Sequence, residues 1–177
     1  MRQLSLLLVL LWGSFQVWAS NSDNWETFSD VGVAGLMGAA LGLPAYKDDW
    51  QGVKQAGYSI AAAAGVSLAG KTLVSEERPD GSGDDSFPSG HSAVAFASAT
   101  TLYRRYGWEK GLPAYAVATL VGIGRVEADK HYWKDVEAGA VIGIVSGWML
   151  TDAFDDKVQL VPWTGRRAVG LAVSYTW

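Results

Sequence analysis

The chain has 177 residues, which is enough for one domain with a substantial core. Its 14 basic and 18 acidic residues give a formal net charge of −4, which argues against nucleic acid as a partner. Cysteine is absent, so disulfides, thiolate metal sites and a cysteine nucleophile are excluded.

Residues 1–19 have the pattern of an export signal. Arg2 precedes an apolar run from Leu4, and residues 17–19 read Val-Trp-Ala before a polar stretch. This pattern predicts a cleavable signal peptide. An uncleaved first membrane helix is the alternative, although the run is barely long enough for one. Both interpretations predict that the rest of the chain enters the export pathway.

Five further apolar segments follow, and we expect each to be a helix. None alternates polar and apolar residues as a half-buried strand does, and Ala, Leu and Met are frequent in them. Gly is also frequent, which allows neighbouring helices to approach closely. The sequence predicts an all-α bundle of five to six short apolar helices in a domain over residues 20–156. The segments cover residues 31–43, 57–74, 91–103, 112–123 and 136–154.

The basic residues predict how this bundle is oriented. Lys47 and Lys54 lie in one connection, and three basic residues at 104–110 lie in another. If the helices alternate in direction, both connections lie at the end opposite the 75–90 loop. By the positive-inside rule, this predicts a membrane-associated bundle with that loop outside the cytoplasm. A water-soluble bundle with solvated basic turns is the alternative, because several segments are short for a bilayer.

The C-terminal residues 157–177 change pattern. In RRAVGLAVSYTW, large apolar residues alternate with small or polar ones, which predicts a strand with one apolar face. Together with residues 158–163, which precede Gly165, it predicts a small β-hairpin. We expect this hairpin or strand to pack on the bundle or a membrane surface, or to pair with another copy.

Two clusters of polar residues stand at ends of the apolar segments and suit an anion. Lys71 and Arg78 are seven residues apart, so they share a face if the helix continues, and Arg matches phosphate oxygens. Pro88-Ser89-Gly90-His91 opens a predicted helix, whose free N–H groups favour phosphate. The ordinary alternatives are a basic helix end near its own dipole and an N-cap.

A third cluster contains Arg125, His131 and Asp135. A carboxylate one helical turn from an imidazole fixes its tautomer and stabilises its charged form, which equips His131 as a nucleophile or base. A surface His–Asp contact is the ordinary alternative. Helices that alternate in direction bring all three clusters, and both histidines of the chain, to one side. That combination suits phosphoryl transfer.

In order, Lys71-x6-Arg78-Pro79, Pro88-Ser89-Gly90-His91 and Arg125-x5-His131-x3-Asp135 resemble the three signature motifs of the type 2 phosphatidic acid phosphatase family. That family shares its phosphate pocket with vanadium haloperoxidases and bacterial class A acid phosphatases. The resemblance fixes ten positions across residues 71–135, which makes it far more specific than a lone glycine motif.

The resemblance implies how a phosphate would be held. Lys71, Arg78 and Arg125 would clamp its oxygens, and Ser89 and the Gly90 amide would add hydrogen bonds. No metal and no other cofactor is implied, because the three cations supply the positive charge.

It also implies the chemistry. His131 would attack phosphorus and form a phosphohistidine, and Asp135 would orient its ring. His91 would protonate the leaving oxygen and then activate water. Gly124 departs from the family, which usually has Ser there, so we expect a lost hydrogen bond near the pocket. The acids of the 80–86 loop, among them Asp85, are expected to be solvated.

The resemblance implies a metal-independent phosphatase in the bacterial cell envelope, with its active site on the periplasmic side. Its substrate would be a phosphate or pyrophosphate monoester of a membrane lipid: phosphatidate, phosphatidylglycerol phosphate, undecaprenyl pyrophosphate or lipid A. One alternative is a soluble periplasmic acid phosphatase of broad specificity. Another is a non-catalytic envelope scaffold or lipid-binding protein. The expected partners are a phosphorylated lipid and a membrane, and the oligomeric state is left open.

Overall fold

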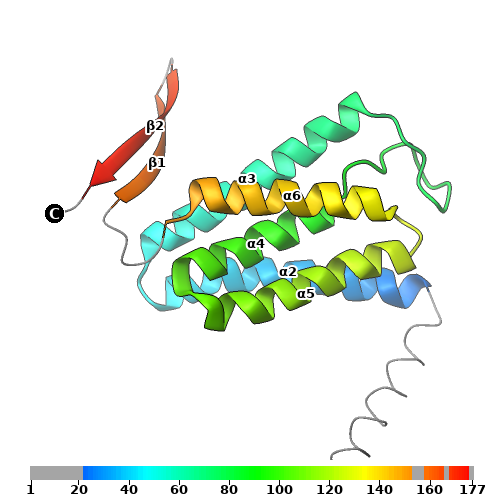
Figure 1. Ribbon diagram of the computed structural model, residues 1–177, viewed down its shortest axis with the longest axis horizontal. Coiled ribbons are helices and arrows are strands. Elements are labelled where there is room, and N and C mark those ends of the chain that lie inside the picture. Colours follow the sequence, from blue (N-terminus) through cyan, green and yellow to red (C-terminus); the bar gives the residue numbers. More distant parts are fainter. Residues whose placement is uncertain (1–21, 153–157, 166–167, 176–177) are drawn as a thin grey trace, which may run out of the picture.

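The computed structural model of the chain describes residues 22–152, 158–165 and 168–175 (Figure 1). The predicted export signal, residues 1–19, lies outside the described residues, as do residues 153–157, where the predicted helical domain meets the C-terminal segment. The described elements are α2 (Ser22–Tyr46), α3 (Trp50–Leu73), α4 (Gly90–Tyr106), α5 (Trp108–Glu127), α6 (Trp133–Leu150), β1 (Val158–Gly165) and β2 (Ala168–Tyr175).

The helices pack side by side in a bundle with α4 at its centre (Figure 1). Helix α4 contacts all four of the other described helices. Its alanines 93, 95, 97 and 99 are fully buried, as expected for a helix that is surrounded by others. The predicted all-α bundle is therefore confirmed.

Small residues set the spacing between the helices. A Cβ atom added at Gly139 or Gly143 of α6 would overlap the backbone oxygen of Ser89 or Ala93 on α4. Gly147, one turn further, lies equally close to the side chain of Thr100. Glycine every fourth residue thus lets α6 lie directly against the backbone of α4.

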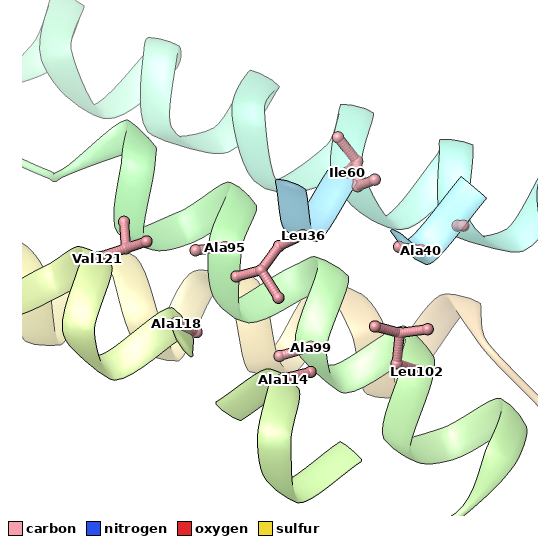
Figure 2. Close-up of a cluster of buried hydrophobic side chains, with 10 residues drawn as sticks. Leu36, Ala40, Ile60, Ala95, Ala99, Leu102, Ala114, Ala118 and Val121 are labelled. Atoms are coloured by element: carbon pink, nitrogen blue, oxygen red, sulfur yellow. The ribbon is translucent and has the colours of Figure 1, made fainter. Parts of the chain in front are cut away.

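The main apolar core lies between α2, α3, α4 and α5 (Figure 2). It is built mostly from small side chains: Leu36, Ala40, Ala56, Ile60, Ala95, Ala99, Leu102, Ala114, Ala118 and Val121. Many large apolar side chains are exposed instead, among them Leu68, Val141 and Met149. Within the described residues, α2 alone is long and apolar enough to cross a membrane, a criterion that core helices and signal sequences also meet.

Four of the five described helices are longer than the apolar segments that predict them, whereas α6 (Trp133–Leu150) is about as long as the 136–154 segment. The five helices contain 17 to 25 residues. Helix α2 begins at Ser22 and continues past Pro44 to Tyr46, and α3 begins at Trp50. Polar end turns belong to these helices but do not contribute to the apolar pattern.

The opposite end of the bundle from the 75–90 loop is closed by buried polar contacts. Arg105 donates two hydrogen bonds to the Asp49 carboxylate, and Tyr106 donates another (2.7 Å). Gln55 and Asp152 bond each other nearby. The side chain of Arg105 is only 3% exposed, so it is not the solvated turn residue that the alternative of a water-soluble bundle expects.

The C-terminal residues form a two-stranded antiparallel sheet. Strand β1 pairs with β2 in a register that places Val158 opposite Tyr175 and Gly165 opposite Ala168. The alternating segment of the sequence corresponds to β2. The surface on which this sheet packs stays a prediction.

Candidate active site

The three predicted clusters lie at one end of the bundle, where α3 and α5 end and α4 and α6 begin (Figure 1). Two backbone hydrogen bonds join the loops that carry them. The Ser89 N–H donates to the Asp135 carbonyl oxygen (2.9 Å), and the Asp80 N–H donates to that of Asp129 (3.0 Å). The alternation of helix directions thus brings the motifs together, as the sequence predicts.

Asp135 is held beside His131 by two other donors. The Ser86 hydroxyl (2.5 Å) and the Tyr132 N–H (2.9 Å) both donate to its Oδ2 atom. The same oxygen lies 3.7 Å from Nδ1 of His131, which is longer than a hydrogen bond. His131 and Asp135 are 2% and 0% exposed, so this is a buried pair and not a surface contact. Ser86 lies outside the three motifs.

The buried imidazole of His131 is neutral at neutral pH. Burial, together with the charges of Arg125, Lys71 and Arg78, lowers the pKa of His131 to about 4, and Asp135 opposes this shift only in part. Asp135 does favour the charged imidazole, as expected, but burial and the three cations outweigh its effect. A neutral imidazole keeps the lone pair that nucleophilic attack requires.

Lys71 and Arg78 meet through a carboxylate of the intervening loop. Arg78 donates to both oxygens of Asp85 (2.9 and 3.1 Å), and the Lys71 ammonium lies 3.5 Å from Oδ2 and also contacts the Asp85 backbone oxygen. The hydrogen bond from Arg78 is the main reason why the pKa of Asp85 is lowered. The Asp85 side chain is 51% exposed, so it remains in contact with solvent as expected, but its carboxylate also pairs with both cations, which the sequence did not indicate.

Lys71 and Arg78 do not share a helix face, although their spacing predicts this if the helix continues. Helix α3 ends at Leu73, and the chain then folds back so that the Arg78 N–H bonds the Gly83 carbonyl oxygen. The turn, rather than a helical repeat, brings the two cations together.

Arg125 reaches toward α2 from the last turn of α5. Its side chain is 4% exposed, and Nη1 lies 3.3 Å from the Ser29 hydroxyl and 3.4 Å from Oδ1 of Asp30. The same Asp30 oxygen lies 2.8 Å from Nε2 of His91. Helix α2 therefore contributes two residues that lie outside the three motifs. In the sequence, Ser29 and Asp30 come directly before the apolar segment 31–43, which begins at this end of the bundle. That position is the feature by which they could have been found.

The packing at Gly124 accounts for the missing serine. A Cβ atom there would lie 3.2 Å from Cβ of Ser29 and 3.3 Å from the Trp25 backbone oxygen, which is tighter than ordinary contact. The hydroxyl of Ser29 lies in this region and accepts a hydrogen bond from Arg125. A hydroxyl from α2 thus contacts the arginine that follows Gly124.

Ser89 and His91 stand at the entrance to α4. The Ser89 hydroxyl oxygen accepts hydrogen bonds from the N–H (3.4 Å) and hydroxyl (3.1 Å) of Ser92, so the N-cap interpretation holds. This leaves the Ser89 hydroxyl proton as a donor. His91 follows the first helical residue, Gly90, with its side chain 36% exposed.

The site concentrates buried polar atoms that lack partners. Among the described residues, four buried side-chain nitrogen or oxygen atoms have no hydrogen-bond partner. Three of them are Nε of Arg125, Nδ1 of His131 and Oδ1 of Asp135. Such groups are costly and cluster where a protein binds or reacts. No group of three or more His, Asp or Glu in the described part of the chain is placed to hold a metal ion.

Comparison with known proteins places these motifs in a family. Residues 80–159 match the model of the PAP2 superfamily, and this range contains the second and third clusters. The chain is 40% identical over 91 residues to a lipid A 1-phosphatase of Porphyromonas gingivalis, covering 50% of this chain and 20% of that protein. It is 32% identical over 96 residues to a lipid A 4′-phosphatase of Helicobacter pylori, covering 51% and 48%. The chain thus spans less than half the length of these two relatives.

Solved structures share the fold. The crystal structure of Aquifex aeolicus LpxE matches with a TM-score of 0.62 and 26% identity, over 72% of this chain and 83% of that one. A transmembrane PAP2-type phosphatidylglycerolphosphate phosphatase from Bacillus subtilis matches in fold with a TM-score of 0.53 and 24% identity, over 73% and 74%. The match over residues 80–159 and the fold shared with LpxE support a member of the type 2 phosphatidic acid phosphatase (PAP2) family.

Proposed function

We propose that the chain is a metal-independent phosphatase that hydrolyses a phosphate or pyrophosphate monoester of a membrane lipid through a phosphohistidine at His131. The observation that carries this proposal is the buried, neutral imidazole of His131 beside three cationic side chains and Asp135. Two relatives are named lipid A phosphatases, which supports a phosphorylated lipid as the substrate.

In the proposed reaction, the phosphate displaces Asp85 from Lys71 and Arg78 and is also bound by Arg125. Asp135 lies on the Nδ1 side of His131, which leaves Nε2 to attack. The Nε2–P bond forms while the bond from phosphorus to the leaving oxygen breaks.

Proton transfers complete the cycle. His91 donates a proton to the leaving oxygen, and the Asp135 carboxylate balances the positive charge of the phosphorylated imidazole. His91 then takes a proton from water, whose oxygen attacks phosphorus, so that inorganic phosphate is released and His131 is restored.

Several features support a membrane location with the site on the periplasmic side. Large apolar side chains are exposed around a core of small ones, which is typical of helices in lipid. Lys47, Lys54 and Lys110 lie toward the end of the bundle away from the site. This is the distribution that the positive-inside rule predicts when the site faces the periplasm.

A groove on the bundle surface supports a substrate with an acyl chain. It lies between α2 and α5, has a volume of about 420 Å³ and is lined mainly by apolar side chains such as Leu43 and Val117. Gly32, at one end of its lining, is two residues from Asp30 on α2. We infer that a lipid chain lies in this groove while its phosphate reaches the site.

Purified full-length chain in detergent is expected to release phosphate from lipid substrates faster than from a soluble ester. Lipid A, phosphatidate, phosphatidylglycerol phosphate, undecaprenyl pyrophosphate and nitrophenyl phosphate are compared side by side by phosphate release. We expect EDTA to leave the rate unchanged, because the side chains supply the positive charge. Loss of activity in EDTA with recovery in Mg²⁺ contradicts the mechanism, and activity on the soluble ester alone favours a soluble acid phosphatase.

Gly35→Leu is expected to lower kcat/KM on a lipid phosphate about tenfold, since it displaces about two lipid methylenes at about 0.8 kcal/mol each. A side chain at Gly35 meets no atom within 4 Å of its Cβ, so the fold tolerates it. Gly38→Leu is the matched control, because Gly38 is equally unobstructed but does not line the groove. Equal effects of the two variants on the lipid substrate contradict an acyl chain in the groove.

A further inference from the structure

We propose that Asp30 of α2 is a positioning residue that orients the imidazole of His91, the leaving-group acid, and favours its protonated form. This inference rests on the proposed function, because it assigns Asp30 to the proton transfer of that reaction. Asp30 lies outside all three signature motifs and precedes the region that matches the family model, residues 80–159.

The geometry is that of a histidine held by a carboxylate. Oδ1 of Asp30 lies 2.8 Å from Nε2 of His91 and 3.4 Å from Nη1 of Arg125. One carboxylate oxygen therefore joins the first turn of α4 to the last turn of α5. In the proposed reaction, His91 acts on a phosphate that Arg125 binds, and Asp30 links His91 to that arginine.

The contact also determines which nitrogen is available. With Nε2 donating to Asp30, the Nδ1–H of His91 remains to protonate the leaving oxygen. That proton moves to the oxygen as the P–O bond breaks, and His91 is left as the neutral imidazole that accepts a proton from water in the second step.

Asp30 supplies negative charge that His91 needs. Burial, Arg125 from α5 and Lys71 from α3 all disfavour a positive charge on His91, and Asp30 opposes them. A carboxylate in contact with the imidazole favours its protonated form. His131 and Asp135 form a second His–Asp pair in the same site, so each proposed catalytic histidine has its own carboxylate.

Asp30 is a suitable target because its own side chain is 54% exposed. Its partner Arg125 is buried, so unfolding followed by circular dichroism checks that each variant keeps the fold. Asp30→Asn keeps the shape of the side chain and removes its charge, whereas Asp30→Glu keeps the charge. Asp84→Asn is the matched control, because it removes one exposed acid from the loop that borders the same site.

The test compares two soluble substrates that differ in their need for a proton. An alkyl phosphate needs protonation of its leaving oxygen, whereas nitrophenolate leaves readily without it. We expect Asp30→Asn to lower kcat/KM for the alkyl phosphate about 10- to 100-fold, within the range that general acid catalysis supplies. The loss on nitrophenyl phosphate is expected to be much smaller. Asp30→Glu is expected to recover part of the activity, and Asp84→Asn to match the wild type on both substrates.

Two results overturn the inference. Asp30→Asn with wild-type activity shows that His91 does not need the carboxylate. Equal losses on both substrates through a raised KM show that Asp30 acts on phosphate binding through Arg125 alone. A wild-type chain that releases phosphate from neither these esters nor any lipid phosphate overturns the proposed function itself, and the inference with it.

Discussion

His131→Ala is expected to abolish phosphate release, with a loss of about 10,000-fold or more, because it removes the attacking atom of the proposed reaction. In the wild type, acid or alkali quenching during turnover is expected to reveal a phosphoprotein that is labile to acid and stable to base, as a phosphoimidazole is. His131→Ala is expected to form none. Phosphate release and radiolabel incorporation from a phosphorylated lipid measure the two effects.

The His91→Ala variant separates the two histidines. It retains the nucleophile but lacks the acid and base, so a substrate with a good leaving group is expected to phosphorylate it and the phosphoenzyme to accumulate. Circular dichroism checks that both variants remain helical. A His131→Ala variant that releases phosphate at the wild-type rate contradicts the mechanism.

Much of the site could be predicted because each motif is local in the sequence. The spacing from Arg125 to His131 to Asp135 crosses a short connection between two helices, so it fixes which residues lie at that end of the bundle. The alternating direction of apolar helices then brings Lys71 and Ser89 to the same end. These inferences need only helix direction, and the apolar pattern supplies it.

The contacts that could not be predicted are those made between elements far apart in the sequence. Asp30 meets His91 and Arg125 across 61 and 95 residues. The Ser86 hydroxyl reaches Asp135 only because the 75–89 loop folds over the start of α6. Such contacts depend on the packing of side chains, which periodicity does not describe.

Asp85 shows why charge in a loop is difficult to interpret from sequence. In the sequence, it is one of several acids between two motifs and has no distinguishing pattern. In the structure, the turn after α3 presents it to Lys71 and Arg78. Two cations that lie close together repel each other, and a nearby carboxylate offsets that repulsion. In the proposed reaction, the phosphate takes the place of this carboxylate.

Asp49→Asn is expected to lower the free energy of unfolding by about 3 kcal/mol, because it removes the negative charge that the buried Arg105 guanidinium contacts through two hydrogen bonds. The substitution keeps a side-chain oxygen to cap α3, where Asp49 accepts the Gly52 N–H (2.9 Å). Hydrogen bonds from Arg105, Tyr106 and Gly52 outweigh burial and hold the pKa of Asp49 below its usual 3.8. Because folding lowers the pKa of Asp49, its ionised carboxylate stabilises the fold at pH values above the pKa of the unfolded chain. This stabilisation is lost as the pH falls through the pKa of the folded chain.

The difference in the free energy of unfolding between wild type and Asp49→Asn is therefore expected to be largest near neutral pH and to become smaller below about pH 4. Unfolding followed by circular dichroism in detergent measures it. Adding Arg105→Met to Asp49→Asn is expected to recover part of the lost stability, because the buried charge that has lost the Asp49 carboxylate is removed while much of the side-chain volume remains. A double variant less stable than Asp49→Asn alone contradicts this expectation and shows that Arg105 also stabilises this end through other contacts, such as those to Gln55 and the Asp152 backbone oxygen.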